Sequence, residues 1–148
     1  MCACQQRNWQ HSLETPEAVA LSVVTALNQG DVEALHRLRV TREEYLAWIW
    51  PSFPSSKAPY AFPADFAWSN LNKKCQIGVN KWVRIYGRQD LVFSSLHFEK
   101  SAEEYKGFRL LRGTVLSAKK PNGDEIALEI IGSMVENAGR YKLLSYRD

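Results

Sequence analysis

Residues 108–147 read FRLLRGTVLSAKKPNGDEIALEIIGSMVENAGRYKLLSYR, and this stretch decides the fold class. Apolar and polar residues alternate here with a period of two, which is the period of β-strands. With the segment before it, the pattern predicts about four strands, over 91–100, 108–118, 125–136 and 141–147. Asn122-Gly123 is a strong signal for a tight hairpin turn. Long strands joined by such turns predict a curved antiparallel sheet.

The chain before these strands contains residues that are typical of helix starts and helix ends. Thr15 suits an N-cap and Gly30 a C-terminal stop, which predicts a first helix between them. Asp31 caps a second, short helix, and Thr41 and Glu44 form a capping box that opens a third. Because the helices precede the strands, we expect an α+β fold in which they cover one face of the sheet.

The longest predicted helix opens at Pro63 and Asp65 and ends before Gly87. Its apolar stripe advances in alternating steps of three and four residues and consists of Trp68, Leu71, Cys75, Gly78, Trp82 and Ile85. Glycine inside a helix costs about 1 kcal/mol relative to alanine. Gly78 therefore predicts a place where another segment's backbone approaches the helix closely.

The composition is that of one ordinary globular domain: 148 residues, 45% apolar and 24% charged. Residues 1–14 predict a flexible tail or tether, and residues 15–148 form the single domain. The net charge is +3, and the charged residues are scattered along the chain. The densest basic clusters are Lys73-Lys74 and Lys119-Lys120. No nucleic-acid partner is predicted, because nucleic-acid binding needs a basic stripe or patch. No membrane-spanning segment is predicted either, because no run of about 18 apolar residues occurs.

Cys2 and Cys4 stand at the N-terminus and are followed by polar residues. The processed end of a bacterial lipoprotein looks similar, with a lipidated cysteine followed by a polar tether, so both are lipidation candidates. The alternative is an ordinary cytoplasmic N-terminus. A lipid-anchored position in the bacterial envelope and a place in the cytoplasm both stay open. No metal site and no cofactor is predicted, because neither a second cysteine pair nor a nearby histidine completes a ligand set.

Two short motifs resemble the nuclear-transport-factor-2-like superfamily, whose members have a cystatin-like, cone-shaped fold. The final strand Gly139-Arg140-Tyr141-Lys142-Leu143 follows an acidic hairpin, and Asn28-Gln29-Gly30-Asp31 matches the turn between the superfamily's first two helices. The order of elements is similar from Thr15 to Tyr146. Membership implies a cone in which sheet and helices enclose an apolar cavity. It implies no activity, because the superfamily includes isomerases, cyclases, dehydratases and epoxide hydrolases as well as non-catalytic modules.

The catalytic pattern of the superfamily's isomerases is absent. Those enzymes use a tyrosine on the first helix with two buried aspartates. Here residues 16–29 contain no tyrosine, and the predicted strands carry no aspartate beyond Asp90 and Asp124 at their edges. The Asp-Arg-Asp arrangement of the epoxide hydrolases also has no counterpart.

Aromatic residues are concentrated between positions 45 and 68. The chain has 5 Trp, 6 Tyr and 6 Phe, and this stretch holds Tyr45, Trp48, Trp50, Phe53, Tyr60, Phe62, Phe66 and Trp68. One interpretation is a rim and lid over the cone's mouth, where the rings hold a small apolar molecule. Its candidate ligand-binding residues are Tyr45, Trp48, Trp50, Tyr60, Phe62, Trp68 and Trp82. The other interpretation is core that plugs the open end of the cone, because aromatic side chains bury large areas.

His97 and Glu99 are the best acid–base candidates. On the predicted strand they share a face with Leu91, Phe93 and Ser95. In a cavity, an imidazole beside a carboxylate could move a proton near neutral pH. The alternative is a polar strand end that faces water.

Glu129 is a further candidate, as the one charge within residues 126–131. A buried carboxylate at this position needs a partner such as Arg109 or Arg112. A structural ion pair and exposure on the outer sheet face are the alternatives to catalysis.

The preferred interpretation is a non-catalytic domain that binds a small ligand or a partner, with an envelope lipoprotein as one form of it. The alternative is a cofactor-free enzyme of the isomerase, dehydratase or cyclase type that uses His97 and Glu99 in an aromatic-lined cavity. A buried His97 facing a cavity would favour the enzyme. A third hypothesis is a homodimer formed through the outer sheet face, which requires a contiguous apolar patch there.

Overall fold

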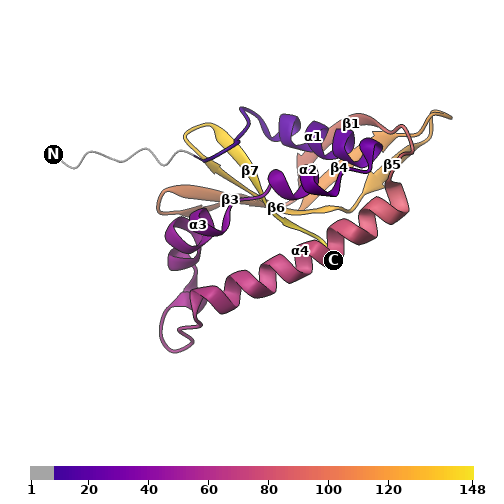
Figure 1. Ribbon diagram of the computed structural model, residues 1–148. Coiled ribbons are helices and arrows are strands. Elements are labelled where there is room, and N and C mark those ends of the chain that lie inside the picture. The colour runs from indigo at the N-terminus through magenta and orange to yellow at the C-terminus, as the bar shows by residue number, and fades with distance from the viewer. Residues whose placement is uncertain (1–8) are drawn as a thin grey trace.

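Two antiparallel sheets and a long helix make up the α+β fold, which the computed structural model describes over residues 9–148 (Figure 1). One sheet has the strand order β1-β4-β5, and the other has the order β2-β3-β6-β7. The strands are β1 (Val92–Phe98), β2 (Glu103–Tyr105), β3 (Phe108–Arg112), β4 (Thr114–Lys119), β5 (Glu125–Leu128), β6 (Ile131–Asn137) and β7 (Arg140–Tyr146). The predicted fold class is confirmed.

Each of the two longest predicted strands is divided between the two sheets. Residues 108–118 form β3 and β4 with a break at Gly113, and residues 125–136 form β5 and β6 with a break after Leu128. Gly113 has a φ of +68°, and a Cβ atom there would lie 3.0 Å from the backbone nitrogen of Lys100. The left-handed backbone and the lack of space both favour glycine at this bend. Residues 9–148 therefore hold seven strands in two sheets, where the sequence predicts about four in one.

Four helices begin at the predicted positions, whereas the short helical turns over residues 50–56 are not predicted. They are α1 (Pro16–Gln29), α2 (Val32–Arg37), α3 (Arg42–Glu44), η1 (Tyr45–Ile49), η2 (Trp50–Ser52), η3 (Pro54–Ser56) and α4 (Ala64–Tyr86). Thr15 and Asp31 cap α1 and α2, Gly30 ends α1 with a φ of +64°, and Thr41 and Glu44 form the capping box. None of the helices within residues 9–148 is long and apolar enough to cross a membrane.

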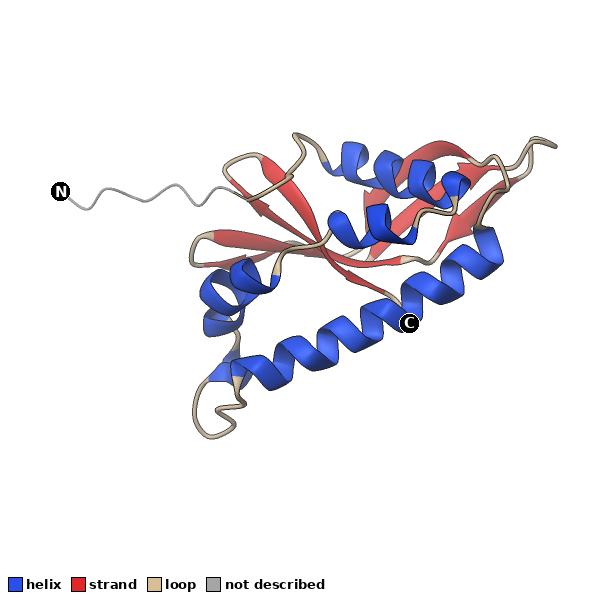
Figure 2. Cartoon of the chain, viewed as in Figure 1, coloured by secondary structure: helices blue, strands red, loops and turns tan. Residues whose placement is uncertain are grey.

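The core consists of two clusters separated by strands β6 and β7. Met134 and Leu143 belong to a large cluster with residues of α1, α2 and α4. Val135 and Leu144 belong to a smaller cluster with Trp9 and residues of η1 and β3. Successive residues of a strand point to opposite faces, so both faces of this strand pair are covered. Figure 2 shows α4 running along the length of the molecule beside the sheets.

The predicted buried stripe of α4 is correct at its centre and wrong at its end. Cys75, Gly78 and Trp82 are buried, whereas Ile85 is 41% exposed. Tyr86 packs against the core in place of Ile85. The reason is the helical period of 3.6 residues, which carries the buried face from Trp82 to Tyr86.

Gly78 is a point of contact between α4 and the C-terminal end of the chain. A Cβ atom at this position would lie 2.2 Å from the backbone oxygen of Arg147. The neighbouring Trp82 indole donates a 2.6 Å hydrogen bond to the same oxygen. The close backbone approach that the sequence predicts at Gly78 is confirmed.

Residues 9–14 are part of the folded domain, which corrects the predicted tail. Trp9 is 4% exposed, and Leu13 exchanges two backbone hydrogen bonds with Tyr141 of β7. The sequence does not reveal this pairing, because a single bridge has no periodic pattern. The lipidation candidates Cys2 and Cys4 lie outside the described residues.

We expect Gly78→Ala to lower the free energy of unfolding by about 1–3 kcal/mol, because the added methyl group forces the α4 and Arg147 backbones apart. The measurement is urea denaturation followed by circular dichroism. Gln76→Ala, on the exposed side of the same helix, serves as the control. A Gly78→Ala protein as stable as the wild type would show that the C-terminus is not packed as described.

Candidate functional site

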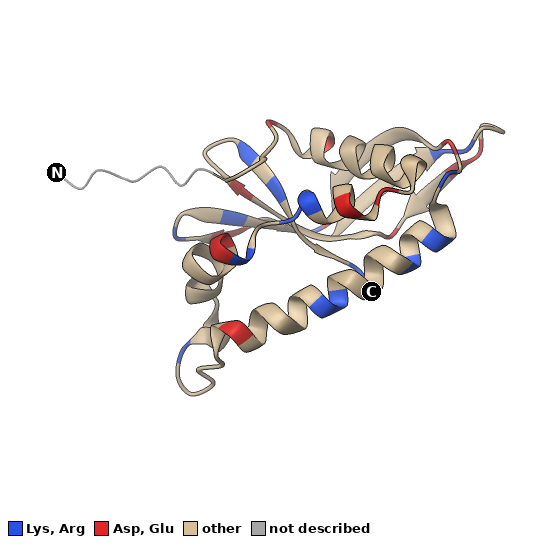
Figure 3. Ribbon diagram, in the orientation of Figure 1, with Lys and Arg blue, Asp and Glu red and all other residues tan. Residues whose placement is uncertain are grey.

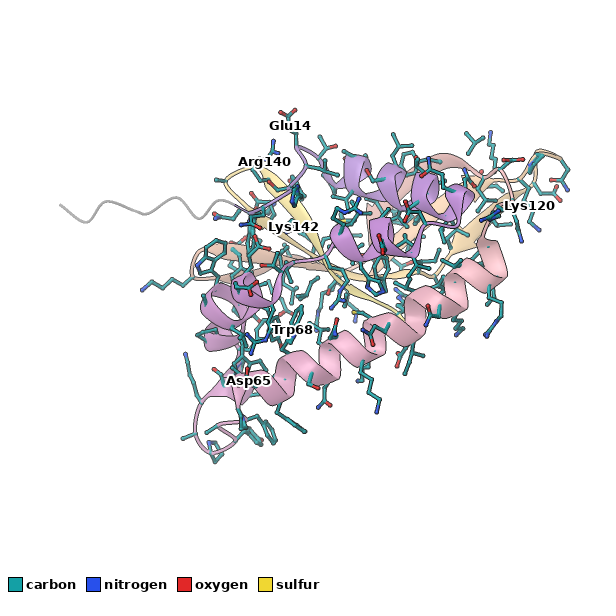
Figure 4. All side chains as sticks on the ribbon, viewed as in Figure 1. Glu14, Asp65, Trp68, Lys120, Arg140 and Lys142 are labelled. Atoms are coloured by element: carbon teal, nitrogen blue, oxygen red, sulfur yellow. The ribbon has the colours of Figure 1, made fainter. Side chains whose placement is uncertain are left out.

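An aromatic pocket lies where η1, η2, η3 and the start of α4 come together. Its volume is about 290 Å³, and its lining residues are Tyr45, Trp50, Ser55, Phe62, Phe66, Ala67 and Asn70. No strand residue lines this pocket. It is therefore built on the helical segment alone, whereas the resemblance implies a cavity between sheet and helices. Figure 4 places Asp65 and Trp68 at this end of α4.

Local hydrogen bonds hold the segment that forms the outer wall. The Trp50 indole donates to the Phe62 carbonyl at 3.3 Å, and the Phe62 amide donates to the Ser55 carbonyl at 3.0 Å. Ser56 donates from its hydroxyl to the Phe53 carbonyl at 2.7 Å. These contacts join η2 and η3 to Phe62, near the end of the proline-rich loop over residues 51–63, so the wall is held at both of its ends.

Aromatic rings stack in two groups around the pocket. Tyr45 lies between Trp50, at 6.2 Å between ring centroids, and Trp68, at 5.4 Å. Phe62 lies between Tyr60, at 6.3 Å, and Phe66, at 6.5 Å. The first group is the inner wall, because Tyr45 is 4% exposed. The second group is the rim, because its rings remain in water.

The rim is an exposed apolar surface. Tyr60 is 64% exposed, Phe62 46% and Phe66 55%. Three adjacent exposed aromatic rings are unusual on a folded protein, where such patches mark ligand or partner sites. Tyr60, Phe62 and Phe66 thus stay exposed, whereas Tyr45 is buried, as the competing core interpretation expects.

Arg39 contacts the inner wall through Trp68. Its guanidinium lies over the Trp68 ring at 5.4 Å from the centroid and donates to the Asn72 side-chain oxygen at 3.0 Å. The side chain is 5% exposed, and its Nε and Nη2 atoms have no hydrogen-bond partner among the described residues. Burial is the main cause that lowers the pKa of Arg39. The sequence gives no signal for this role, because Arg39 follows Arg37 in a segment that looks solvated.

A buried ion pair holds the start of η1 in place. Lys142 of β7 and Glu44, the residue before Tyr45, lie 2.8 Å apart, and their side chains are 1% and 4% exposed. The Glu44 carboxylate also accepts hydrogen bonds from the backbone amides of Thr41 at 2.8 Å and Gln10 at 2.9 Å. A buried carboxylate is stable only when such donors satisfy it. The pair therefore fixes Tyr45 relative to the sheet.

The structure brings five of the seven predicted ligand-binding residues together. Tyr45, Trp50 and Phe62 line the pocket, and Tyr60 and Trp68 stack on lining rings. Trp48 and Trp82 do not belong to this site. Trp48 packs against Trp9 at 5.3 Å beside a different hollow. Trp82 is a core residue with its indole bonded to Arg147.

Four lining residues are missing from the predicted set: Ser55, Phe66, Ala67 and Asn70. Phe66 and Asn70 are separated by four residues on α4, so helical spacing places them on one face. That spacing is a signal from which they could be found. Ser55 lies in the proline-rich loop, where no periodicity exists.

His97 does not occupy the buried position that the enzyme alternative requires. Partner residues in β4 shift between Phe93 and Ser95, so β1 contains a bulge. The extra residue reverses the alternation, and His97 is exposed, as is Glu99. The predicted shared face with Leu91 and Phe93 is therefore wrong for both.

Glu129 is exposed as well, at the break between β5 and β6. Of the predicted alternatives, exposure is the one that the structure shows, and an exposed carboxylate needs no partner such as Arg109 or Arg112.

The sheets do not show the apolar face that the homodimer hypothesis requires. Among the exposed large apolar side chains of residues 9–148, only Val92 belongs to a strand. Three of the others form the rim, and the rest lie on α1 and α4. The homodimer itself stays a prediction.

No protein-family model, curated protein or solved structure matches this chain. The resemblance to the nuclear-transport-factor-2-like superfamily stays a prediction from the sequence.

We expect Lys142→Met to lower the free energy of unfolding by about 3–5 kcal/mol, because it leaves the Glu44 carboxylate buried without its cation. Chemical denaturation of the variant and the wild type measures this difference in the free energy of unfolding. Asp65→Asn, which removes an exposed ion pair with Arg42, should cost less than about 1 kcal/mol.

The double variant Lys142→Met with Glu44→Leu separates the ion pair from general packing. It should recover part of the lost stability, because it removes both charges together. A Lys142→Met protein within about 1 kcal/mol of the wild type would contradict the proposed support of η1.

Proposed function

We propose that this domain binds one small, planar, mainly apolar molecule in the aromatic pocket. The observation that carries the proposal is the combination of a hollow of about 290 Å³ with rings that remain exposed around it. Binding of a ligand that covers exposed rings is favourable, because it removes apolar surface from water. A rim that served only as core would be buried already.

The lining favours binding over catalysis. Apart from the Trp50 indole, which is bonded to the Phe62 carbonyl, its polar side chains are those of Tyr45, Ser55 and Asn70. The lining contains no carboxylate, imidazole or thiol. General acid–base and nucleophilic catalysis most often use those missing groups. Polar groups of the kind present orient a ligand and set specificity.

The volume of the pocket suits a ligand of about two fused rings. A cavity of about 150 Å³ accepts benzene, and the pocket here has about twice that volume. The exposed rim means that a ligand keeps some contact with water. We therefore expect a dissociation constant on the order of 10–100 µM, which corresponds to about 6 kcal/mol of binding free energy.

We expect naphthalene to bind the folded protein saturably and to shift the amide signals of residues 45–70 in a nuclear magnetic resonance titration. Phe66→Ala should weaken this binding about tenfold, because it removes one ring contact. Leu21→Ala is the matched control, since Leu21 is 51% exposed but lies on α1. Shifts that do not saturate, or an equal effect of the two substitutions, would contradict the proposed pocket.

A further inference from the structure

Tyr45 supplies the most deeply buried polar group of the pocket lining. The Tyr45 side chain is 4% exposed, whereas Ser55 is half-buried and Asn70 is exposed. Its ring is held between Trp50 and Trp68, and the preceding residue is held by the buried pair of Glu44 with Lys142. The position of the hydroxyl is therefore set before any ligand arrives, which lowers the entropic cost of binding.

The Tyr45 hydroxyl is available to a ligand. Among residues 9–148, the side-chain atoms sealed from solvent without a hydrogen-bond partner belong to Trp9, Arg39 and Thr114. The Tyr45 oxygen is not one of them, although it makes no hydrogen bond within the described part of the chain. It therefore reaches accessible space, and the pocket is a space that Tyr45 lines.

The hydroxyl is a hydrogen-bond donor at physiological pH. Burial raises the pKa of Tyr45 to about 12. The phenol thus keeps its proton well above neutral pH. A ligand acceptor in the pocket would give this hydroxyl the hydrogen-bond partner that the described residues do not provide.

The lining of the pocket carries no charge. No lining residue is charged, and Lys57 is the one charged residue between positions 45 and 64. Figure 3 shows the loop before α4 almost without coloured positions. The cation of Arg39 lies over Trp68 and does not line the pocket. An anionic ligand would lose hydration at the aromatic wall without gaining a counter-charge.

We infer that the ligand of this pocket is a neutral, planar ring compound that carries a hydrogen-bond acceptor, and that the Tyr45 hydroxyl selects this class by donating to the acceptor. This inference rests on the proposed function, since it requires the pocket to bind a ring compound. It names Tyr45 as the residue that determines specificity.

The test compares four ring compounds of similar size by isothermal titration calorimetry at mildly alkaline pH. Naphthalene has no acceptor, quinoline and isoquinoline are its neutral nitrogen-containing isosteres, and 2-naphthoate carries a negative charge. We expect the better of the two isosteres to bind about three- to tenfold more tightly than naphthalene, as one net hydrogen bond provides. We expect 2-naphthoate to bind more weakly than naphthalene.

Tyr45→Phe keeps the ring and removes the hydroxyl, so it should abolish the preference for the isostere and leave naphthalene binding unchanged. Tyr105→Phe is the matched control, because the Tyr105 hydroxyl donates to Glu103 outside the pocket. Thermal unfolding of each variant confirms that it is folded.

Each outcome decides a different point. Equal binding of naphthalene and both isosteres, or a preference that survives in Tyr45→Phe, overturns the role of Tyr45 while the apolar pocket stands. Tightest binding of 2-naphthoate overturns the neutral class. Failure of all four compounds to bind overturns the proposed function itself.

Discussion

The buried contact between Lys142 and Glu44 is the interaction on which the rest of the structure depends. It joins the last strand to the capping box of α3, and through Gln10 it also holds the start of the described chain. Removing two charges from water is expensive, so a single arrangement with every donor and acceptor satisfied is strongly preferred. A slip of β7 by one residue would turn Lys142 to the other face. The pair thereby sets the register of the strand that separates the two core clusters.

The aromatic pocket follows from this constraint. Tyr45 begins η1 directly after Glu44, so its ring has one position relative to the sheet. Trp68 on α4 packs against it, and the Arg39 guanidinium lies over the Trp68 ring. The inner wall is consequently rigid. The rim is different, because the rings of Tyr60 and Phe62 stay exposed. A rigid wall with an exposed rim is an arrangement that suits capture of a small ring compound.

Sequence patterns predict the helices and strands of this protein better than they predict which face of each element is buried. The helix caps at Thr15, Asp31 and Thr41 depend on contacts over three residues, and all of them form. The strand face that carries His97 depends on the whole of β1, and one extra residue near Ser94 reverses it. Bulges and the break at Gly113 have no periodic signal of their own. The candidate site was predictable to the extent that aromatic residues cluster in sequence, which identified Tyr45, Trp50 and Phe62.

The sequence by itself determined the α+β class, the order of the helices and the concentration of aromatic rings before α4. These properties depend on local preferences and short-range periodicity, which each segment carries alone. The tertiary structure decided which rings became core and which stayed exposed, that Lys142 meets Glu44 across 98 residues, and that the acid–base candidates point to water. Those outcomes depend on contacts between distant segments, whose free energies exist only after the chain has brought them together.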